Sequence, residues 1–277
     1  MKLNGPLCQV VITGAGSGFG RAIALTLAKR NAKLVLSDLD SDSLQETAQL
    51  ARDFGAARVV TQLCDVTRLQ DVQALASLCD GDIHLVVNNA GVATSGYVGQ
   101  LSIEDWRWTL EVDLFGVIHG CHVFVPLLKN QQFGHILNVA SAAGLLHAPM
   151  MAAYNAAKAG VVAISETLYG ELAGTGVGVT VLCPTFFQTN IVKNGRFNSP
   201  ETQTLAQRYI AQGPKAEKIA EAALRAIECN RFYCIPMWDG RLIWRLKRAI
   251  PWMYLKLLPL LRDQADGFRK KRNHQIT

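Results

Sequence analysis

The chain has 277 residues, of which 49% are hydrophobic and 18% are charged. This length and composition are sufficient for one large α/β domain with a substantial core, and they exclude a disordered or low-complexity protein. The net charge of +6 is uneven, because residues 241–277 contain ten Lys or Arg and two Asp, which leaves residues 1–240 at −2. The basic charge therefore belongs to a C-terminal tail.

The N-terminus and the cysteines indicate the cellular compartment. The opening "MKLNGPLCQVVITGAG" has a Gly-Pro break before a short apolar run, so we expect no signal peptide. No uncharged apolar stretch reaches the roughly 18 residues of a membrane span, so no span is expected. The seven cysteines are odd in number and form no CxxC pair. We therefore expect a cytoplasmic protein with free thiols.

Apolar, β-branched runs alternate with helical patterns along the chain. The runs are residues 7–13, 33–38, 57–63, 83–88, 134–140, 178–183 and 231–236. Apolar residues recur at helical spacing within residues 20–30, 42–54, 68–79, 103–129, 151–173 and 216–228. Such alternation predicts a doubly wound Rossmann fold, with a central parallel sheet of about seven strands and helices on both faces.

The domain organisation follows from these runs. We expect one Rossmann-type catalytic domain over residues 1–240 and a basic, aromatic-rich tail over residues 241–277. The Asn-, Gln- and Gly-rich segment around residues 185–213 follows a strand, which makes it a candidate lid over the carboxyl edge of the sheet.

The first strand is followed by a glycine-rich turn. Gly14, Gly16, Gly18 and Gly20 lie between this strand and the first helix, with Ser17 and Phe19 among them. Bare backbone there can approach a pyrophosphate that rests on the helix N-terminus. The turn therefore predicts a dinucleotide site.

Asp38 ends the second strand, 18 residues after Gly20. A carboxylate at this point can accept both hydrogen bonds of an adenosine ribose, and it would repel a 2′-phosphate. Neither Ser17 nor Leu39 supplies a cation that could attract this phosphate, so we predict NAD rather than NADP. The alternative is that Asp38 only caps the next helix.

Tyr154 and Lys158 are four residues apart in "YNAAK", which places them on one face of a helix. A phenol with a pKa of about 10 needs a shift of roughly three units to act as a base near neutrality. An ammonium about 4 Å away supplies nearly that much. Ser141 follows a strand, and its hydroxyl could hold a carbonyl oxygen against the phenol, although a serine at this point, taken alone, is more often a plain helix cap.

Asp113 is the unusual residue of the long apolar helix. Glu111 and Asp113 are about 200° apart around the helix axis, and from Val112 to Gly120 only Asp113 is charged. The carboxylate of Asp113 should therefore point inward, where it needs a partner or a proton.

Together, "TGAGSGFG" (13–20), "NNAG" (88–91), Ser141 and "YNAAK" (154–158) resemble the short-chain dehydrogenase/reductase family in its single-domain form, over residues 7–236. The resemblance implies hydride transfer between a nicotinamide and an alcohol or ketone. It implies Tyr154 as the general acid/base, Lys158 on the nicotinamide ribose and Ser141 orienting the substrate. The cofactor contacts that it implies are Gly14, Gly16, Ser17, Gly18, Phe19, Gly20, Asp38, Asp65, Val66, Asn89, Ala90, Gly91, Tyr154, Lys158, Pro184, Phe187 and Thr189.

Within that set, Asp65 corresponds to the residue beside the adenine, and Thr189 to the hydroxyl on the carboxamide. The chain departs from the family at two points. Thr185 follows Pro184 where the family usually has glycine, and Asp113 replaces the catalytic asparagine. An ionised Asp113 near Lys158 would partly cancel the effect of the lysine on Tyr154.

The expected substrate pocket, residues 92–95, 145–151 and 186–187, is mainly apolar. It indicates a hydrophobic secondary alcohol or ketone. The alternative is a catalytically weak or inactive NAD-binding scaffold or sensor. We expect a homo-oligomer, dimer or tetramer, as is common in the family. No His/Cys/Asp cluster suggests a metal site.

The tail segment 241–262 combines Trp, Tyr and Leu with several cations. Two interpretations remain open: a peripheral contact with the inner face of a membrane, or packing on protein while the cations reach water. Pro251 and Pro259 favour two or three short pieces over one helix. The basic run 269–275 does not change the expectation of no nucleic-acid partner, because no nucleic-acid-binding fold accompanies it.

Overall fold

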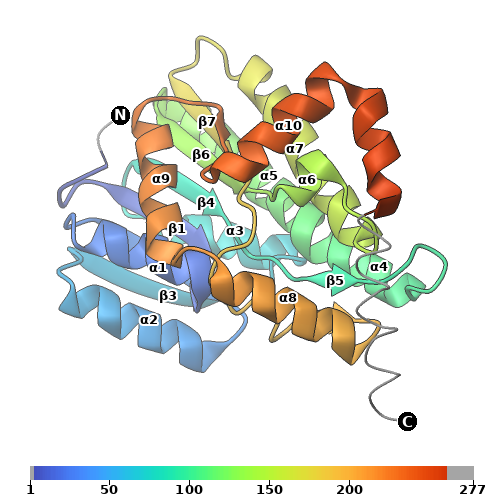
Figure 1. Ribbon diagram of the computed structural model, residues 1–277. Helices are drawn as coiled ribbons and strands as arrows, with labels where there is room; N and C mark the ends of the chain where they lie inside the picture. The colour runs from blue at the N-terminus through green and yellow to red at the C-terminus, as the bar shows by residue number, and fades with distance from the viewer. Residues whose placement is uncertain (1–2, 261–277) are drawn as a thin grey trace.

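A computed structural model describes residues 3–260, which form a seven-stranded parallel sheet between two layers of helices (Figure 1). The strand order is β3-β2-β1-β4-β6-β7-β9. The strands are β1 (Gln9–Thr13), β2 (Lys33–Asp38), β3 (Arg58–Leu63), β4 (Ile83–Asn88), β6 (Gly134–Val139), β7 (Val177–Leu182) and β9 (Tyr233–Cys234). This arrangement confirms the doubly wound Rossmann fold.

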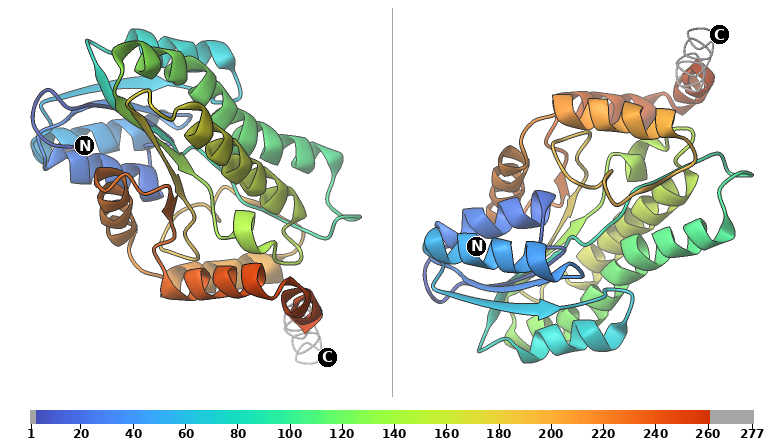
Figure 2. Two further views of the ribbon diagram at one scale, coloured as in Figure 1. Left: turned by 90° about the horizontal axis from the view of Figure 1, so that it is seen from above. Right: turned by 90° about the horizontal axis from the view of Figure 1, so that it is seen from below.

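Helices cover both faces of the sheet because strand side chains alternate between two cores. Val10 and Ile12 point into one core, whereas Val11 points into the other. The first core packs under α1 (Gly18–Ala28), α2 (Ser41–Asp53) and α9 (Ala216–Glu228). The second packs under α3 (Leu69–Ser77), α5 (Gly116–Gln131) and α7 (Ala152–Glu171), and Figure 2 shows the two layers from above and below.

The strand order reverses between β1 and β4. β1 pairs with β2 on one side and with β4 on the other, so the loops at their carboxyl ends diverge from a common point. In open α/β sheets this switch point is where ligands bind. The glycine-rich turn after β1 and the segment after β4 both start there.

The long helix predicted for residues 103–129 is interrupted. It consists of α4 (Ile103–Leu110), a π-helical turn η1 (Glu111–Phe115) and α5. In the π turn, the N–H of Gly116 donates to the carbonyl of Glu111, five residues back. The sequence pattern did not predict this turn, which coincides with the inward carboxylate Asp113, and such turns are frequent at functional sites.

The same stretch, Ile103–Gln131, is long and apolar enough to cross a membrane, and it is the one such stretch among residues 3–260. Its α5 part packs on β4 and β6 and against α3. The stretch was not expected to pass as a span on its sequence.

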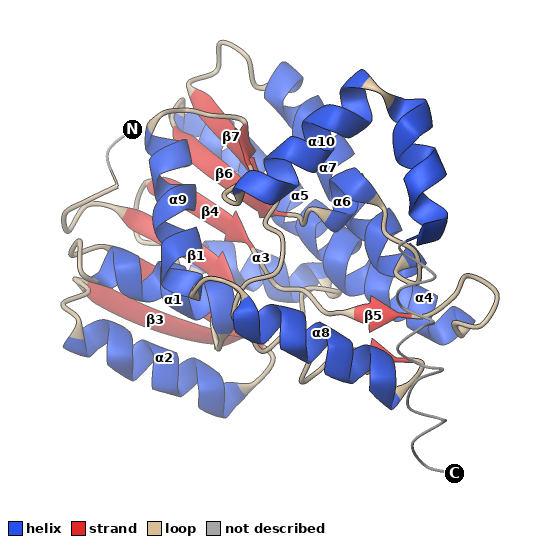
Figure 3. Ribbon diagram, viewed as in Figure 1, coloured by secondary structure: helices blue, strands red, loops and turns tan. Residues whose placement is uncertain are grey.

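The segment 185–213 contains β8 (Arg196–Phe197) and α8 (Pro200–Gln212). β8 pairs in parallel with β5 (Thr94–Ser95), a two-stranded unit beside the main sheet that Figure 3 shows near α8. The sequence did not predict this pair, because each strand has only two residues. It ties the segment after β7 to the loop after β4.

The first part of the tail packs on the body of the protein. It forms α10 (Trp238–Ala249) and a second helical segment, residues 251–260. Pro251 begins this segment, as expected for a break, whereas Pro259 does not interrupt it within the described residues. α10 contacts the short helix α6 (Ala143–Leu146). The basic run 269–275 lies outside the residues that the structure describes.

Candidate active site

The glycine-rich turn is close to neighbouring backbone and side chains. An added Cβ at Gly20 would lie 2.1 Å from the carbonyl oxygen of Gly14, and one at Gly16 would lie 2.9 Å from Asp38 Oδ2. Gly18 has φ +54°, and its Cβ would lie 2.7 Å from Thr189 Oγ1. A side chain at Gly20 would overlap the backbone, and one at Gly16 or Gly18 would displace Asp38 or Thr189, so the close packing of this turn favours glycine.

Asp38 is fixed at the end of β2. Its Oδ2 accepts a hydrogen bond from the N–H of Gly16 at 2.7 Å, and its Oδ1 accepts one from the N–H of Asp40 at 3.0 Å. The cap of α2 is Asp40, whose side chain accepts from Asp42 and Ser43. The alternative reading, that Asp38 merely caps the next helix, is therefore wrong.

The segment after β4 lies against this turn. The Asn89 side chain donates to the carbonyls of Thr13 and Gly14 at 2.8 and 2.9 Å. The N–H groups of Asn89 and Ala90 both donate to Thr13 Oγ1. Thr13, which the sequence analysis did not single out, therefore holds the two loops together at the switch point.

Asp65 and Val66 follow β3. The Asp65 carboxylate accepts from the N–H and hydroxyl of Thr67 at 3.0 and 2.7 Å. The Val66 carbonyl accepts from His119 Nδ1 at 2.8 Å, so this histidine is a packed one. Asp65 and Val66 thus stand at the carboxyl edge on the side of α5.

A cleft of about 440 Å³ opens beside the N-terminus of α1. Its lining includes Ser17, Gly18 and Thr189, together with Arg21, Ala22, Leu25, Gln188, Asn190, Lys215, Ala216 and Glu217. Ser17 makes no capping hydrogen bond with its side chain. The cleft therefore joins the start of α1 to the segment after β7.

Three more residues that were predicted to contact the cofactor, Pro184, Phe187 and Phe19, make contacts within the protein. The Pro184 carbonyl accepts from the N–H of Ala142 at 2.8 Å, and the side chains of Phe19 and Phe187 belong to or pack against the core under α1. Phe186 stacks on Tyr209 of α8, with ring centroids 5.2 Å apart. Phe187 therefore has a structural role on the core side.

Ser141, Tyr154 and Lys158 meet at the carboxyl ends of β6 and β7. Tyr154 and Lys158 lie on the buried face of α7, and the Lys158 Nζ is 5.7 Å from the centroid of the Tyr154 ring. Ser141 is near enough to Tyr154 to lower the pKa of the phenol, and its Oγ accepts from the N–H of Ala143 at 3.1 Å. The structure thus brings the three predicted residues together.

Asp113 lies inside this group. Its Oδ2 is 3.5 Å from Lys158 Nζ, and its Oδ1 accepts from the N–H of Val92 at 2.7 Å. Lys158 also donates to the Val139 carbonyl at 3.1 Å. A Cβ at Gly91 would lie 3.1 Å from Asp113 Oδ1 and 3.3 Å from Lys158 Nζ, so a side chain there would crowd the pair.

The electrostatics differ from the expected arrangement. Burial raises the pKa of Tyr154, the charge of Asp113 raises it further, and the nearby Ser141 side chain lowers it. The Lys158 ammonium contacts Asp113 and the Val139 carbonyl, and it lies 5.7 Å from the centroid of the Tyr154 ring. The lowering of the pKa of Tyr154 by Lys158 stays a prediction. Burial also raises the pKa of Asp113, against the opposing effects of Lys158 and the Val92 N–H.

A contact from the tail reaches the loop beyond Ser141. Lys247 of α10 donates to the Leu145 carbonyl and lies 3.0 Å from His147 Nδ1. His147 has a left-handed backbone with φ 54°. The sequence analysis missed Lys247, because no local pattern links residues 100 positions apart.

Among residues 3–260, no group of three or more His, Cys, Asp or Glu side chains has the arrangement of a metal site. All seven cysteines are free. The chemistry that the described residues offer is therefore proton transfer by the phenol, hydrogen bonding by the serine and electrostatic tuning by the ion pair.

The sequence and the fold are similar to those of known oxidoreductases. Residues 9–199 match the family described as short chain dehydrogenase. The chain is 40% identical over 205 residues to the oxidoreductase SadH of Mycobacterium tuberculosis, with 72% of this chain and 74% of SadH covered. It is 32% identical over 263 residues to a CLA biosynthesis dehydrogenase/reductase of Lactiplantibacillus plantarum, with 86% and 92% covered.

Two solved structures with a similar fold are short-chain dehydrogenases in complex with a nicotinamide cofactor. A short chain dehydrogenase/reductase from Burkholderia phymatum in complex with NAD has a TM-score of 0.84 and 38% identity, covering 90% of this chain and 95% of that chain. A short-chain dehydrogenase from Sphingobium yanoikuyae in complex with NADPH has a TM-score of 0.77 and 25% identity, with 90% and 95% covered. The chain belongs to the short chain dehydrogenase family and is an oxidoreductase with nicotinamide-binding neighbours.

Proposed function

We propose that the protein transfers a hydride between NAD(H) and a hydrophobic secondary alcohol or ketone. The observation that carries this proposal is the placement of Ser141, Tyr154 and Lys158 together, beside the glycine-rich turn. A scaffold that only binds a nucleotide has no physical need for a buried phenol beside a serine hydroxyl and an ammonium.

The described residues fit a dinucleotide. The pyrophosphate would rest on the N–H groups at the start of α1, in the cleft lined by Ser17, Gly18 and Thr189. Asp65 and the Asn89–Gly91 segment would flank the adenine and the ribose. A bound nicotinamide would supply the hydride donor or acceptor.

Asp38 supports NAD over NADP. Its carboxylate is held by Gly16 and Asp40, in position to accept from ribose hydroxyls and to repel a 2′-phosphate. The nearest arginine of α1, Arg21, is engaged by the Gly16 carbonyl at 2.7 Å and by Glu46. Its guanidinium is therefore not a free cation for a phosphate.

Tyr154 would move the proton. In alcohol oxidation its phenolate takes the hydroxyl proton of the substrate, and in ketone reduction its phenol returns one. Ser141 would hold the same substrate oxygen. Lys158 would bind the nicotinamide ribose and stabilise the phenolate, with Asp113 limiting that stabilisation.

The substrate is proposed to be lipophilic because the surrounding loops are mainly apolar. Leu145 is buried beside the site, and the loop that contains Met150 is held to β5 by the hydrogen bond from Ser95 Oγ to the Met150 carbonyl at 3.0 Å. The relatives include a CLA biosynthesis dehydrogenase/reductase and an estradiol 17-beta-dehydrogenase 11 of Pongo abelii, and these names support an apolar substrate.

A panel of secondary alcohols with NAD, monitored at the nicotinamide absorbance, tests the function. We expect turnover that Tyr154→Phe reduces at least a thousandfold while NAD binding, measured by calorimetry, persists. Absence of turnover on the whole panel with intact NAD binding would favour the scaffold or sensor instead.

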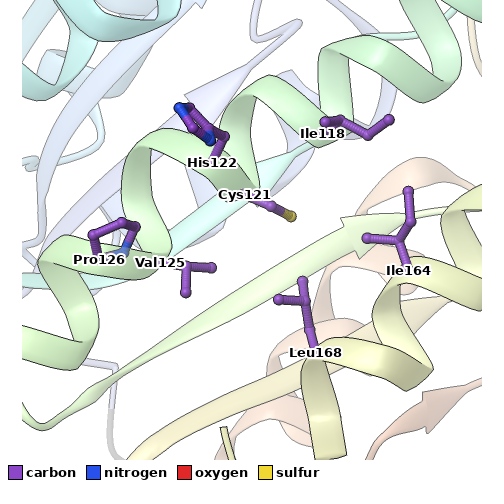
Figure 4. A pocket seen from close by; sticks show the side chains of 7 residues that line it. All are labelled: Ile118, Cys121, His122, Val125, Pro126, Ile164 and Leu168. Atoms are coloured by element: carbon purple, nitrogen blue, oxygen red, sulfur yellow. The ribbon is translucent and has the colours of Figure 1, made fainter. Parts of the chain in front are cut away.

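We also propose that the protein is a homo-oligomer. The outer faces of α5 and α7 form an apolar groove of about 520 Å³, lined by Ile118, Cys121, His122, Val125, Pro126, Ile164 and Leu168 (Figure 4). Ala156 and Ala163 of α7 are exposed beside it. A twofold-related copy would bring the same apolar faces together, as in an isologous dimer.

The proposed compartment is the cytoplasm. The seven free cysteines, of which five are buried, support this location, because a reducing compartment keeps such thiols unpaired.

A further inference from the structure

We propose that α10 and the helical segment 251–260 form a docking face for the surface of an anionic lipid bilayer. This inference goes beyond the proposed reaction, because binding to a vesicle requires no turnover. The face consists of the outward side chains of residues 238–260.

The inner side of α10 is held on the body of the protein. A Cβ at Gly240 would lie 2.7 Å from Thr185 Cγ2, so the start of the helix packs closely there. The Trp244 ring lies 4.9 Å from the Tyr233 ring, and Lys247 donates to the Leu145 carbonyl. These contacts are spaced at three to four residues and therefore fix which side of α10 faces outward.

The outer side is apolar and uncovered. Trp238, Leu242 and Leu246, at successive spacings of four, expose 71%, 48% and 42% of their surface. In the next helical segment, Trp252 and Leu255 are each 62% exposed. Exposed apolar side chains that gather in this way mark an interaction site rather than ordinary surface.

Cations flank the apolar side chains. Arg241, Arg245 and Arg248 follow one another along α10 at spacings of four and three, and all are exposed. Lys256 lies 5.2 Å from the centroid of the Trp252 ring. Residues 238–260 contain five Lys or Arg and one acidic residue, Asp239. Helices with Trp and Leu beside Lys and Arg are typical of the interface of anionic membranes.

The charge favours lipid over a second copy of the chain. In a twofold contact through this face, the arginines of both copies would approach each other, and Asp239 is the one acidic residue of the segment that could offset them. Anionic headgroups would instead neutralise the arginines while Trp238 and Leu242 enter the acyl boundary. α8 and α10 lie on the same side of the molecule (Figure 2), so a bilayer there would face the loops around the site.

Co-sedimentation of the full chain with vesicles tests the proposal. We expect binding to phosphatidylcholine vesicles that contain a third phosphatidylserine, weaker binding at high salt, and little binding to pure phosphatidylcholine. Replacing Arg241, Arg245 and Arg248 with Gln should weaken partitioning about a hundredfold, because each cation near the headgroups contributes about a factor of five. The matched control is Arg52→Gln, a cation near the end of α2.

The apolar contribution is tested by Leu246→Glu against Leu7→Glu, which changes an equally apolar and more exposed side chain near β1. We expect the first variant to lose vesicle binding and the second to keep it, with unchanged melting temperatures for both. Equal vesicle binding by Leu246→Glu and the wild type would overturn the proposal. So would a change of oligomeric state in Leu246→Glu without any change in vesicle binding, which would assign the face to a second copy.

Discussion

Asp113 and Lys158 form an ion pair whose side chains expose only 0% and 3% of their surface, with 3.5 Å between Oδ2 and Nζ. The pair lies next to Tyr154, and the carboxylate raises the pKa of this phenol. The negative charge therefore opposes the function that Lys158 would otherwise serve.

Asp113→Asn should make the activity optimum of alcohol oxidation more acidic. The phenolate is the active form, so activity rises with pH through the pKa of Tyr154. Removal of a charge at an effective dielectric of about 20 lowers that pKa by about one to two units. The pH profile of kcat/KM measures the shift. Glu111→Gln, an exposed change in the same π turn, is the control, and coincident profiles for Asp113→Asn and the wild type would contradict the prediction.

Asp38→Asn should reduce the preference for NAD. The amide keeps an oxygen for the N–H of Gly16 but loses the charge that repels a 2′-phosphate, so kcat/KM with NADP should rise about tenfold relative to NAD. Steady-state kinetics with both cofactors measure this ratio. Asp42→Asn, in the first turn of α2, should leave it unchanged. A wild-type protein that clearly prefers NADP would refute the basis of the prediction.

Lys247→Met should weaken substrate binding more than turnover. The variant keeps the aliphatic stem but loses the donor to the Leu145 carbonyl, which loosens the loop between Ser141 and Tyr154. We expect a several-fold higher KM, a smaller change in kcat and a loss of about 1–2 kcal/mol in unfolding free energy. Kinetics and chemical denaturation check both effects. Lys256→Met is the control, and an equal rise in its KM would argue against a specific role for the loop contact.

The unfolding free energy of the protein should fall in acid because the buried His135 must take up a proton. Burial lowers its pKa to about 4, and its Nε2 lies 2.8 Å from Thr180 Oγ1. Since the Thr180 hydroxyl donates to the Arg231 carbonyl, Nε2 is the donor to Thr180. The pKa of His135 is lower in the folded state than its unfolded value of about 6.5. Above that pH, the neutral imidazole makes its full contribution to the stability of the protein. It falls by about 3 kcal/mol between pH 6.5 and pH 4.

Urea denaturation at several pH values measures this slope. In the His135→Gln variant, the loss of unfolding free energy between pH 6.5 and pH 4 should be smaller by about 3 kcal/mol, even though the variant is less stable at neutral pH. The half-buried His84→Gln, outside the groove between α5 and α7, serves as the control, and identical slopes for His135→Gln and the wild type would exclude His135 as the cause.

Ile164→Lys should dissociate the proposed oligomer. Its side chain lines the groove between α5 and α7, so a cation there would lie inside a contact between apolar faces (Figure 4). Sedimentation velocity should show a smaller species for this variant. Gln49→Lys on α2, in the opposite helix layer, should sediment like the wild type. A monomeric wild type would contradict the proposal itself.

Much of the site could be predicted from the sequence because its spacing is local. Tyr154 and Lys158 share a helix face by their separation of four, and Asp38 ends a strand with a β-branched and apolar pattern. The inward direction of Asp113 follows from its uncharged neighbours. Parallel strands bring their carboxyl ends to one edge, so residues after different strands could be assigned to one site.

The parts of the site and of the fold that could not be predicted depend on contacts between segments that are distant in the sequence. Nothing local predicts that Lys247 reaches Leu145, or that β5 pairs with β8, because each contact is a few atoms between loops. The direction of the pKa shift of Tyr154 also depends on where the Lys158 ammonium points. A spacing of four fixes the face of the helix but leaves the rotamer of a long side chain undetermined.

The π turn at Glu111–Phe115 changes the direction in which the side chains of α5 point around the helix axis. A π turn holds about one residue more than an α turn, so α5 is rotated about the axis relative to a continuation of α4. Deletion of one residue from this turn would restore a regular helix at the cost of its present alignment. Gly116 lies against Val66, and Gly120 lies against Asn88. After the deletion, larger residues would take the places of these two glycines, and their side chains would not fit. The surplus residue thus lets one helix satisfy two sets of neighbours.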